Sequence, residues 1–353
     1  MTVRLINGDC VEVMRTLPAE SVHCIVTSPP YYGLRDYGVA GQIGMENSLS
    51  EYVAKMVEVF AEARRVLRDD GTLWLNLGDS YAGSWGAQSR EHAGKHRANI
   101  SAISANQIIA AQRRQSRTGS IPSGSGLKPK DLMGIPWRVA FALQADGWYL
   151  RSDIIWAKPN PMPESIRDRP TKAHEYLFLL AKSERYYYDV DAAAEPRSSA
   201  NGPGVAGWAI GEGPHDAIVH NRDKGDAKTF RGGQYTNGAK FNNSHATERD
   251  SIGNKPATID KRNRRTVWTI PTHSFSEAHF ATFPPALVEP CISAGCPVGG
   301  TVLDPFGGAG TTGLVADRLQ RDAVLIELNL EYVEMARRRL SGDAPLFAEV
   351  VTA

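Results

Sequence analysis

The sequence predicts an α/β fold built on one doubly wound, mostly parallel β-sheet. Short apolar runs recur along the 353 residues, stripes with a helical period separate several of them, and polar residues stand just past four of the expected strand ends. No internal repeat is apparent. The expected strands are residues 3–6, 22–26, 72–77, 149–156, 176–181, 267–270, 301–303 and 323–326.

Helices are expected between these strands, as is typical of parallel sheets that are covered on both faces. In residues 50–67, Tyr52, Met56 and Val59 follow the helical period, and Gly71 is expected to end this helix. Further helices are expected at residues 286–294, 313–320 and 331–340.

Composition favours a globular cytoplasmic protein. No apolar run approaches the roughly 20 residues that cross a bilayer, and the first residues lack the basic and apolar regions of a signal peptide. The four cysteines are too few and too widely spaced for a disulfide framework or a zinc site. We therefore expect buried free thiols, no metal and no membrane association.

The net charge of +1 hides two basic segments. Residues 84–130 carry eight Lys and Arg against one carboxylate, and residues 198–265 are also basic and rich in Gly and Asn. Either segment alone is compatible with a solvated loop, but the two together favour contact with a polyanion. The candidate phosphate contacts are Arg113, Arg114, Arg117, Arg231, Lys240, Arg262, Arg264 and Arg265.

A first motif follows the apolar run 22–26, where residues 27–32 read Thr-Ser-Pro-Pro-Tyr-Tyr. The two prolines stiffen the turn and leave its carbonyl oxygens free of local helix bonds. Ser28 Oγ and the Pro29 carbonyl can then accept the two N–H hydrogens of an amino group on a planar ring, with Tyr31 stacked on that ring. The alternative for this motif alone is an ordinary turn after a strand.

A second motif, residues 302–312, reads Val-Leu-Asp-Pro-Phe-Gly-Gly-Ala-Gly-Thr-Thr and joins an expected strand to an expected helix. Its glycines let the backbone approach a ligand closely. Glu327 follows the next strand, where a carboxylate can bind ribose hydroxyls. The glycines are too close together for the dinucleotide fingerprint, and no P-loop Gly-Lys-Ser/Thr is present.

Together the two motifs resemble those of the S-adenosylmethionine-dependent DNA amino-methyltransferases, in the order of the beta class. That family places an [S/D/N]-P-P-[Y/F/W] motif early and D-P-F-x-G-x-G-T-T late. The resemblance extends over residues 5–9, 71–79, 147–182 and 279–340, and Ala309 departs from it where the family usually has Ser. It implies a Rossmann-like methyltransferase fold with a circularly permuted motif order.

The resemblance also implies a role for each motif. The methyl group comes from S-adenosyl-L-methionine, and the base is flipped out of the duplex with no covalent enzyme intermediate. The catalytic positions are Ser28, Pro29, Pro30 and Tyr31. The cofactor positions are Asp9, Asp304, Pro305, Phe306, Gly307, Gly308, Gly310, Thr311, Thr312 and Glu327, with Asp9 on the adenine and Glu327 on the ribose.

The same resemblance suggests how the chain is divided. We expect a catalytic half (1–83), a basic insertion (84–130), a continuation of the core (131–197), a target-recognition region (198–265) and a cofactor-binding half (266–353). Double-stranded DNA is the expected partner, and the family suggests a homodimer. Lys158 is expected to contact DNA or the base pocket, and His174 and Glu175 to form a buried hydrogen-bonded pair.

Several alternatives stay open from the sequence. Adenine N6 is the preferred target, but Ser28 in the first motif suits cytosine N4 equally. An RNA or protein amide methyltransferase and a pure DNA-binding module are the rival classes. Cys291 follows Pro290, the dipeptide of cytosine C5-methyltransferases, but it lies in an expected helix and is interpreted as structural.

Overall fold

A computed structural model describes residues 1–33, 38–82, 126–161, 163–196, 261–272, 283–343 and 349–352. Its contacts divide the chain into a larger unit, Met1–Ala193 with Arg265–Ala353, and a smaller unit, Ala194–Arg264. The two motifs at residues 27–32 and 302–312 both lie in the larger unit.

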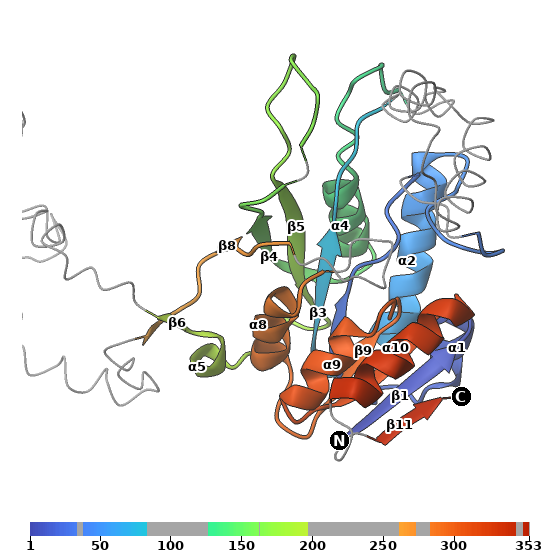
Figure 1. Cartoon of the computed structure of the whole chain (residues 1–353), viewed down its shortest axis with the longest axis vertical. Coiled ribbons are helices and arrows are strands. Elements are labelled where there is room, and N and C mark those ends of the chain that lie inside the picture. The colour runs from blue at the N-terminus through green and yellow to red at the C-terminus, as the bar shows by residue number, and fades with distance from the viewer. Residues whose placement is uncertain are drawn as a thin grey trace, which may run out of the picture. The chain divides into compact units, whose positions relative to one another are not determined.

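The described part of the larger unit contains a nine-stranded sheet in the order β11-β1-β10-β9-β2-β3-β5-β4-β8 (Figure 1). Its strands are β1 (Thr2–Asn7), β2 (Val22–Thr27), β3 (Leu67–Leu77), β4 (Tyr149–Ala157), β5 (His174–Ala181), β8 (Val267–Thr269), β9 (Thr301–Asp304), β10 (Asp322–Glu327) and β11 (Glu349–Thr352). All pairs from β11 to β3 are parallel, whereas β5 runs antiparallel to both β3 and β4. This confirms the predicted mostly parallel sheet.

Helices cover both faces of the sheet. Those of the larger unit are α1 (Cys10–Thr16), α2 (Leu49–Val66), α4 (Ile135–Ala145), α5 (Val190–Ala193), α8 (Pro285–Gly295), α9 (Thr311–Arg318) and α10 (Leu330–Asp343). Helices α1, α2 and α4 pack in one hydrophobic cluster and α8, α9 and α10 in another. Alternation along β2 follows this division, because Ile25 faces the first cluster while Cys24 and Val26 face the second. The sheet is therefore doubly wound, as predicted.

Helix α2 shows how the sequence sets an element and where the prediction was wrong. Ser48 caps its start by accepting a hydrogen bond from Glu51 N at 3.2 Å, and its apolar stripe is buried in the first cluster. The helix ends at Val66, and the chain enters β3 at once. Gly71 thus lies inside a strand and does not end the helix.

The smaller unit is described only at its ends, where β6 (Glu195–Pro196) pairs antiparallel with β7 (Lys261–Arg262). Arg262 Nε lies 2.7 Å from Glu195 Oε1, so its charge is compensated within this unit.

No described helix is long and apolar enough to cross a membrane. The described residues also hold no cluster of His, Cys, Asp and Glu that could bind a metal ion. All four cysteines lie among the described residues, and each is a buried thiol outside any disulfide, as expected from the sequence.

Candidate active site

The two sequence motifs meet because β2 and β9 are neighbours in the sheet. Ile25 lies opposite Leu303 in this parallel pair, so both strands end at the same rim. Just past that register, Thr27 Oγ1 donates a 2.6 Å hydrogen bond to Asp304 Oδ1. The structure therefore places Ser28 and the glycine-rich turn side by side.

Asp304 ties three segments together at this rim. Besides the bond from Thr27, its carboxylate accepts hydrogen bonds from Thr312 Oγ1 at 2.6 Å and from Phe306 N at 3.0 Å. The side chain is fully buried, and burial raises the pKa of Asp304 to about 6 against the opposing effect of these bonds. Asp304 and Thr312 thus hold the turn and do not line the cavity.

The turn itself needs glycine where it meets α9 and α10. Gly310 is the N-cap of α9 with φ of 76°, a left-handed conformation that side chains disfavour. A Cβ at this position would lie 3.0 Å from Ala336 Cβ on α10. The turn can therefore lie close to α10 while its backbone N–H groups stay near the start of α9.

Two carboxylates stand at the next strand ends. Glu327 accepts a hydrogen bond from Gly308 N and another from Asn329 N, both at 2.8 Å, and burial raises its pKa. Asp9 caps α1 by accepting from Val11 N at 2.9 Å. Each carboxylate keeps lone pairs for a ligand.

A cavity of about 270 Å³ joins the two motifs. Of the residues predicted for the site, it is lined by Asp9, Ser28, Pro29, Pro30, Tyr31, Lys158, Pro305, Phe306, Gly307, Gly308, Thr311 and Glu327. Asn76, Glu175, Asn329 and Tyr332 also line it and were not predicted. Asn76 is an amide within the apolar run Leu-Trp-Leu-Asn-Leu that ends β3, a signal that could have singled it out.

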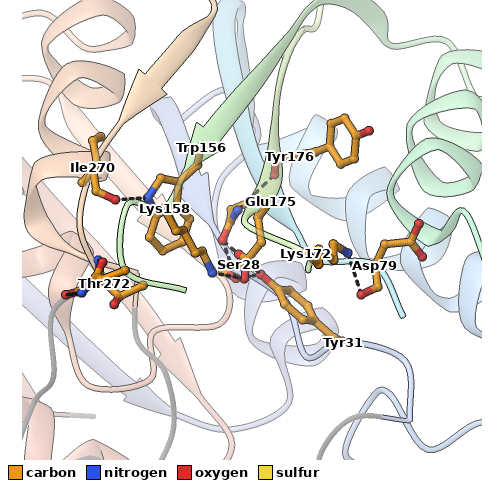
Figure 2. Close-up of polar contacts among 12 residues, drawn as sticks. Ser28, Tyr31, Asp79, Trp156, Lys158, Lys172, Glu175, Tyr176, Ile270 and Thr272 are labelled. Carbon is orange, nitrogen blue, oxygen red and sulfur yellow. Dashed lines mark hydrogen bonds and ion pairs between the residues drawn. The ribbon is translucent and has the colours of Figure 1, made fainter. Parts of the chain in front are cut away.

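A polar network surrounds Tyr31 on one wall of this cavity (Figure 2). The Tyr31 hydroxyl donates to Glu175 Oε2 at 2.8 Å and lies 3.1 Å from Asn76 Oδ1. Ser28 Oγ is 3.3 Å from the same amide oxygen and 3.4 Å from the Tyr31 hydroxyl. Asn76 Nδ2 donates to the Tyr176 carbonyl at 3.0 Å, which fixes the amide with its oxygen toward Ser28 and Tyr31.

Lys158 lies on the same wall, paired with Glu175 by a hydrogen bond between Nζ and Oε1. Both side chains are largely buried, at 17% and 18% exposed. The ammonium also stands 4.1 Å from the centre of the Trp156 ring, whose Nε1 donates to the Ile270 carbonyl at 2.8 Å (Figure 2).

The expected pair of His174 and Glu175 was wrong. The two residues are consecutive in β5, so their side chains point to opposite faces of the sheet. Glu175 contacts Tyr31 and Lys158, while the His174 ring packs edge-on against Tyr176 at 5.4 Å between centroids.

The residues predicted to contact DNA are spread over several parts of the chain. Lys158 lies in the cavity wall, Arg262 is paired within the smaller unit, Arg264 is half-buried and Arg265 is exposed. The other predicted contacts, Arg113, Arg114, Arg117, Arg231 and Lys240, lie outside the described residues.

Comparison with known proteins places this site in a family. A family model described as DNA methylase, N6_N4_Mtase, matches residues 22–338. Type II methyltransferase M.Cfr9I of Citrobacter freundii is 44% identical over 340 residues, which cover 96% of this chain and 88% of that protein. M.SmaI of Serratia marcescens is 43% identical over 337 residues, which cover 96% and 90%.

Two solved structures share the fold. The cytosine-N4-specific PvuII DNA methyltransferase has a TM-score of 0.56 at 16% identity, over 99% of this chain and 96% of that one. TTHA0409 from Thermus thermophilus, in complex with S-adenosyl-L-methionine, has a TM-score of 0.54 at 20% identity, over 99% of both chains. The fold is therefore that of DNA methyltransferases, and the chain belongs to the N6/N4 family of DNA methylases.

Proposed function

We propose that this enzyme transfers the methyl group of S-adenosyl-L-methionine to an exocyclic amino group of a base in double-stranded DNA. One observation carries the proposal: a single cavity is lined by both the Ser28 motif and the glycine-rich turn, so a donor and an acceptor bound there would face each other. Proximity of this kind supplies a large part of the rate in group transfer.

The cofactor would lie along the turn side of the cavity. The backbone from Phe306 to Thr311 suits the methionine part, because glycines allow close approach. Glu327 would accept hydrogen bonds from the ribose hydroxyls, and Asp9 from the adenine edge. Asp304 and Thr312 would act indirectly, by holding the turn.

The target amine would lie at the other end of the cavity. Ser28 Oγ and the Pro29 carbonyl would accept its two N–H hydrogens, which draws the nitrogen toward sp³ and frees its lone pair for attack on the methyl carbon. The base must leave the helical stack to reach this position, and Tyr31 offers an aromatic face to receive it.

Adenine N6 and cytosine N4 are both compatible with these acceptors. Adenine N6 is the first candidate, because adenine enzymes predominate in the class that the motifs resemble. Cytosine N4 is the second, and Lys158 favours it, since its ammonium has N–H donors beyond the one held by Glu175. Such a donor would bond the O2 oxygen of cytosine, which is carried on the carbon next to ring nitrogen N3. Adenine has only a C–H group at the equivalent carbon.

Digestion of methylated DNA to nucleosides tests the proposal and identifies the base. With labelled S-adenosyl-L-methionine and duplex DNA, we expect the label in N6-methyladenosine or N4-methylcytidine in their deoxy forms. Label in RNA or protein but not in duplex DNA would instead establish an RNA or protein amide methyltransferase. A pure DNA-binding module predicts no transfer to any substrate.

The remaining expectations are part of the same proposal. The basic segments 84–130 and 198–265 would contact the DNA backbone, and the second would read the target sequence. We also propose the division into two core halves with these insertions, and a homodimer. A DNA substrate favours a cytoplasmic location, which we propose as well.

A further inference from the structure

Methylation of an amine leaves a proton that the site must remove. As the nitrogen lone pair forms the bond to the methyl carbon, the carbon–sulfur bond breaks and its electron pair stays on sulfur. The nitrogen then carries a positive charge and one hydrogen too many. In the proposed function, Ser28 Oγ accepts a hydrogen bond from one of these N–H groups. A serine hydroxyl can keep an added proton only if it passes its own hydroxyl proton onward.

Asn76 is the nearest acceptor to Ser28, yet it cannot take up a proton at neutral pH. Its amide oxygen lies 3.3 Å from Ser28 Oγ and is held in place by the bond from Nδ2 to the Tyr176 carbonyl. An amide only orients the two hydroxyls beside it. The proton must therefore reach a carboxylate.

Three carboxylates line the cavity within the described chain: Asp9, Glu175 and Glu327. Asp9 and Glu327 accept hydrogen bonds from backbone N–H groups of α1 and of the glycine-rich turn, on the side proposed for the cofactor. Glu175 alone among the three is hydrogen-bonded to the motif that would hold the amine, through the Tyr31 hydroxyl at 2.8 Å.

We propose that Glu175 is the final acceptor of the proton lost by the methylated amine, and that the Ser28 and Tyr31 hydroxyls relay it; this inference rests on the proposed function. The amine N–H passes its proton to Ser28 Oγ, Ser28 passes its own to the Tyr31 oxygen 3.4 Å away, and Tyr31 passes its own to Glu175 Oε2. The amine ends neutral, both hydroxyls are restored, and Glu175 ends protonated.

The surroundings of Glu175 suit this task. Lys158 and Lys172 are the cations that face it, and Tyr31 is its titratable neighbour. The Lys158 pair fixes one carboxylate oxygen and leaves Oε2 toward Tyr31. With 18% of its side chain exposed, Glu175 can release the proton to solvent after turnover.

Single-turnover methyl transfer with Glu175→Gln and Tyr31→Phe tests the relay. Tyr31→Phe keeps the aromatic ring but interrupts the relay, and Glu175→Gln keeps the shape but cannot take the proton. We expect each rate to fall by about 10²-fold or more, with S-adenosyl-L-methionine affinity unchanged by calorimetry. The rate of both variants should increase with pH more steeply than the wild-type rate does, since hydroxide then replaces the missing acceptor.

The double variant should be no slower than the slower single variant, because both changes interrupt one path. Glu164→Gln is the matched control: this glutamate is also ion-paired, to Arg169 at 2.9 Å, but does not line the cavity, and its rate should equal that of the wild type.

Two results would overturn the relay: a wild-type rate in Tyr31→Phe or Glu175→Gln, or slow variants that keep the wild-type pH profile, which would make Glu175 a positioning residue only. Should Glu175→Gln fail to fold, Tyr31→Phe decides by itself. Failure of the proposed function is distinct, because the wild-type enzyme would then methylate no base.

Discussion

Tyr31 packs against the backbone of Gly78, and this contact sets where its ring can lie. A Cβ at Gly78 would come within 2.4 Å of Tyr31 Cε2, so Gly78→Ala must displace the ring. Overpacking of this kind costs about 1–3 kcal/mol. We expect methyl transfer to fall because the displaced ring no longer lies where it would receive the base, by about tenfold for each 1.36 kcal/mol of transition-state stabilisation lost, while S-adenosyl-L-methionine affinity is unchanged.

Gly342→Ala provides the control for this change. A Cβ there meets no atom within 4 Å, and the residue lies in α10, where alanine is the better helix former. Equal activity of Gly78→Ala and Gly342→Ala would contradict a role for the Tyr31 ring position. Rate and affinity measured on both proteins separate loss of the site from loss of folding.

At the scale of elements, Asp79 links the end of β3 to the start of α4. Its carboxylate accepts hydrogen bonds from Gly134 N at 3.1 Å and from Ile135 N at 3.0 Å, and so caps a helix that begins 56 residues later. We expect Asp79→Ala to lower the free energy of unfolding by about 1 kcal/mol, measured by urea denaturation. Asp317→Ala, in the last turn of α9, should have little effect, and an equal loss in both would contradict the cap.

Asp304 joins β9 to β2 and α9, and its burial predicts a dependence of stability on pH. Its pKa is about 6 in the folded protein and about 3.8 when unfolded, so the folded state holds the proton more tightly. The raised pKa therefore contributes on the order of 3 kcal/mol to the free energy of unfolding. This contribution is fully present below pH 3.8 and is lost as pH rises through 6.

Asp304→Asn removes that titration and keeps acceptors for Thr27 and Phe306. The free energy of unfolding of the variant, relative to the wild type, should therefore rise between pH 4.5 and pH 7. A difference that stays constant over this range would show that Asp304 has an ordinary pKa in the folded protein.

The elements were predictable from sequence where periodicity and strand ends carry the signal. The apolar run before Ser28 and the run before Asp304 are both strands, and they pair in the sheet. The end of α2 was not predictable from Gly71, because β3 already begins at Leu67, where the chain pairs with Val22 of β2. Strand β11 was missed as well, since it follows the last expected helix as a short edge strand.

At the scale of the whole molecule, the meeting of the two motifs followed from the rule that ligands collect at the carboxyl ends of parallel strands. The wall formed by Asn76, Lys158 and Glu175 did not follow from it. Glu175 reaches the cavity only because β5 runs antiparallel beside β3 and so begins at the same rim. Nothing local to residues 174–181 encodes that pairing partner or direction.

The basic segment 84–130 predicts a salt dependence of DNA binding. Replacing Arg113, Arg114 and Arg117 with Gln should reduce the slope of log K against log salt by up to roughly 3, because each phosphate contact contributes about 0.9. Lys158→Gln is the comparison, since its ammonium is paired with Glu175 and should leave the slope unchanged. An unchanged slope in the triple variant would exclude these arginines as phosphate contacts.

A crystal structure with S-adenosyl-L-methionine bound tests the central claim most directly. We predict the ribose against Glu327, the methionine along residues 306–311 and the transferable methyl group aimed at the space beside Ser28 Oγ. A ligand bound elsewhere, or one whose methyl group is turned away from Ser28, would contradict the account.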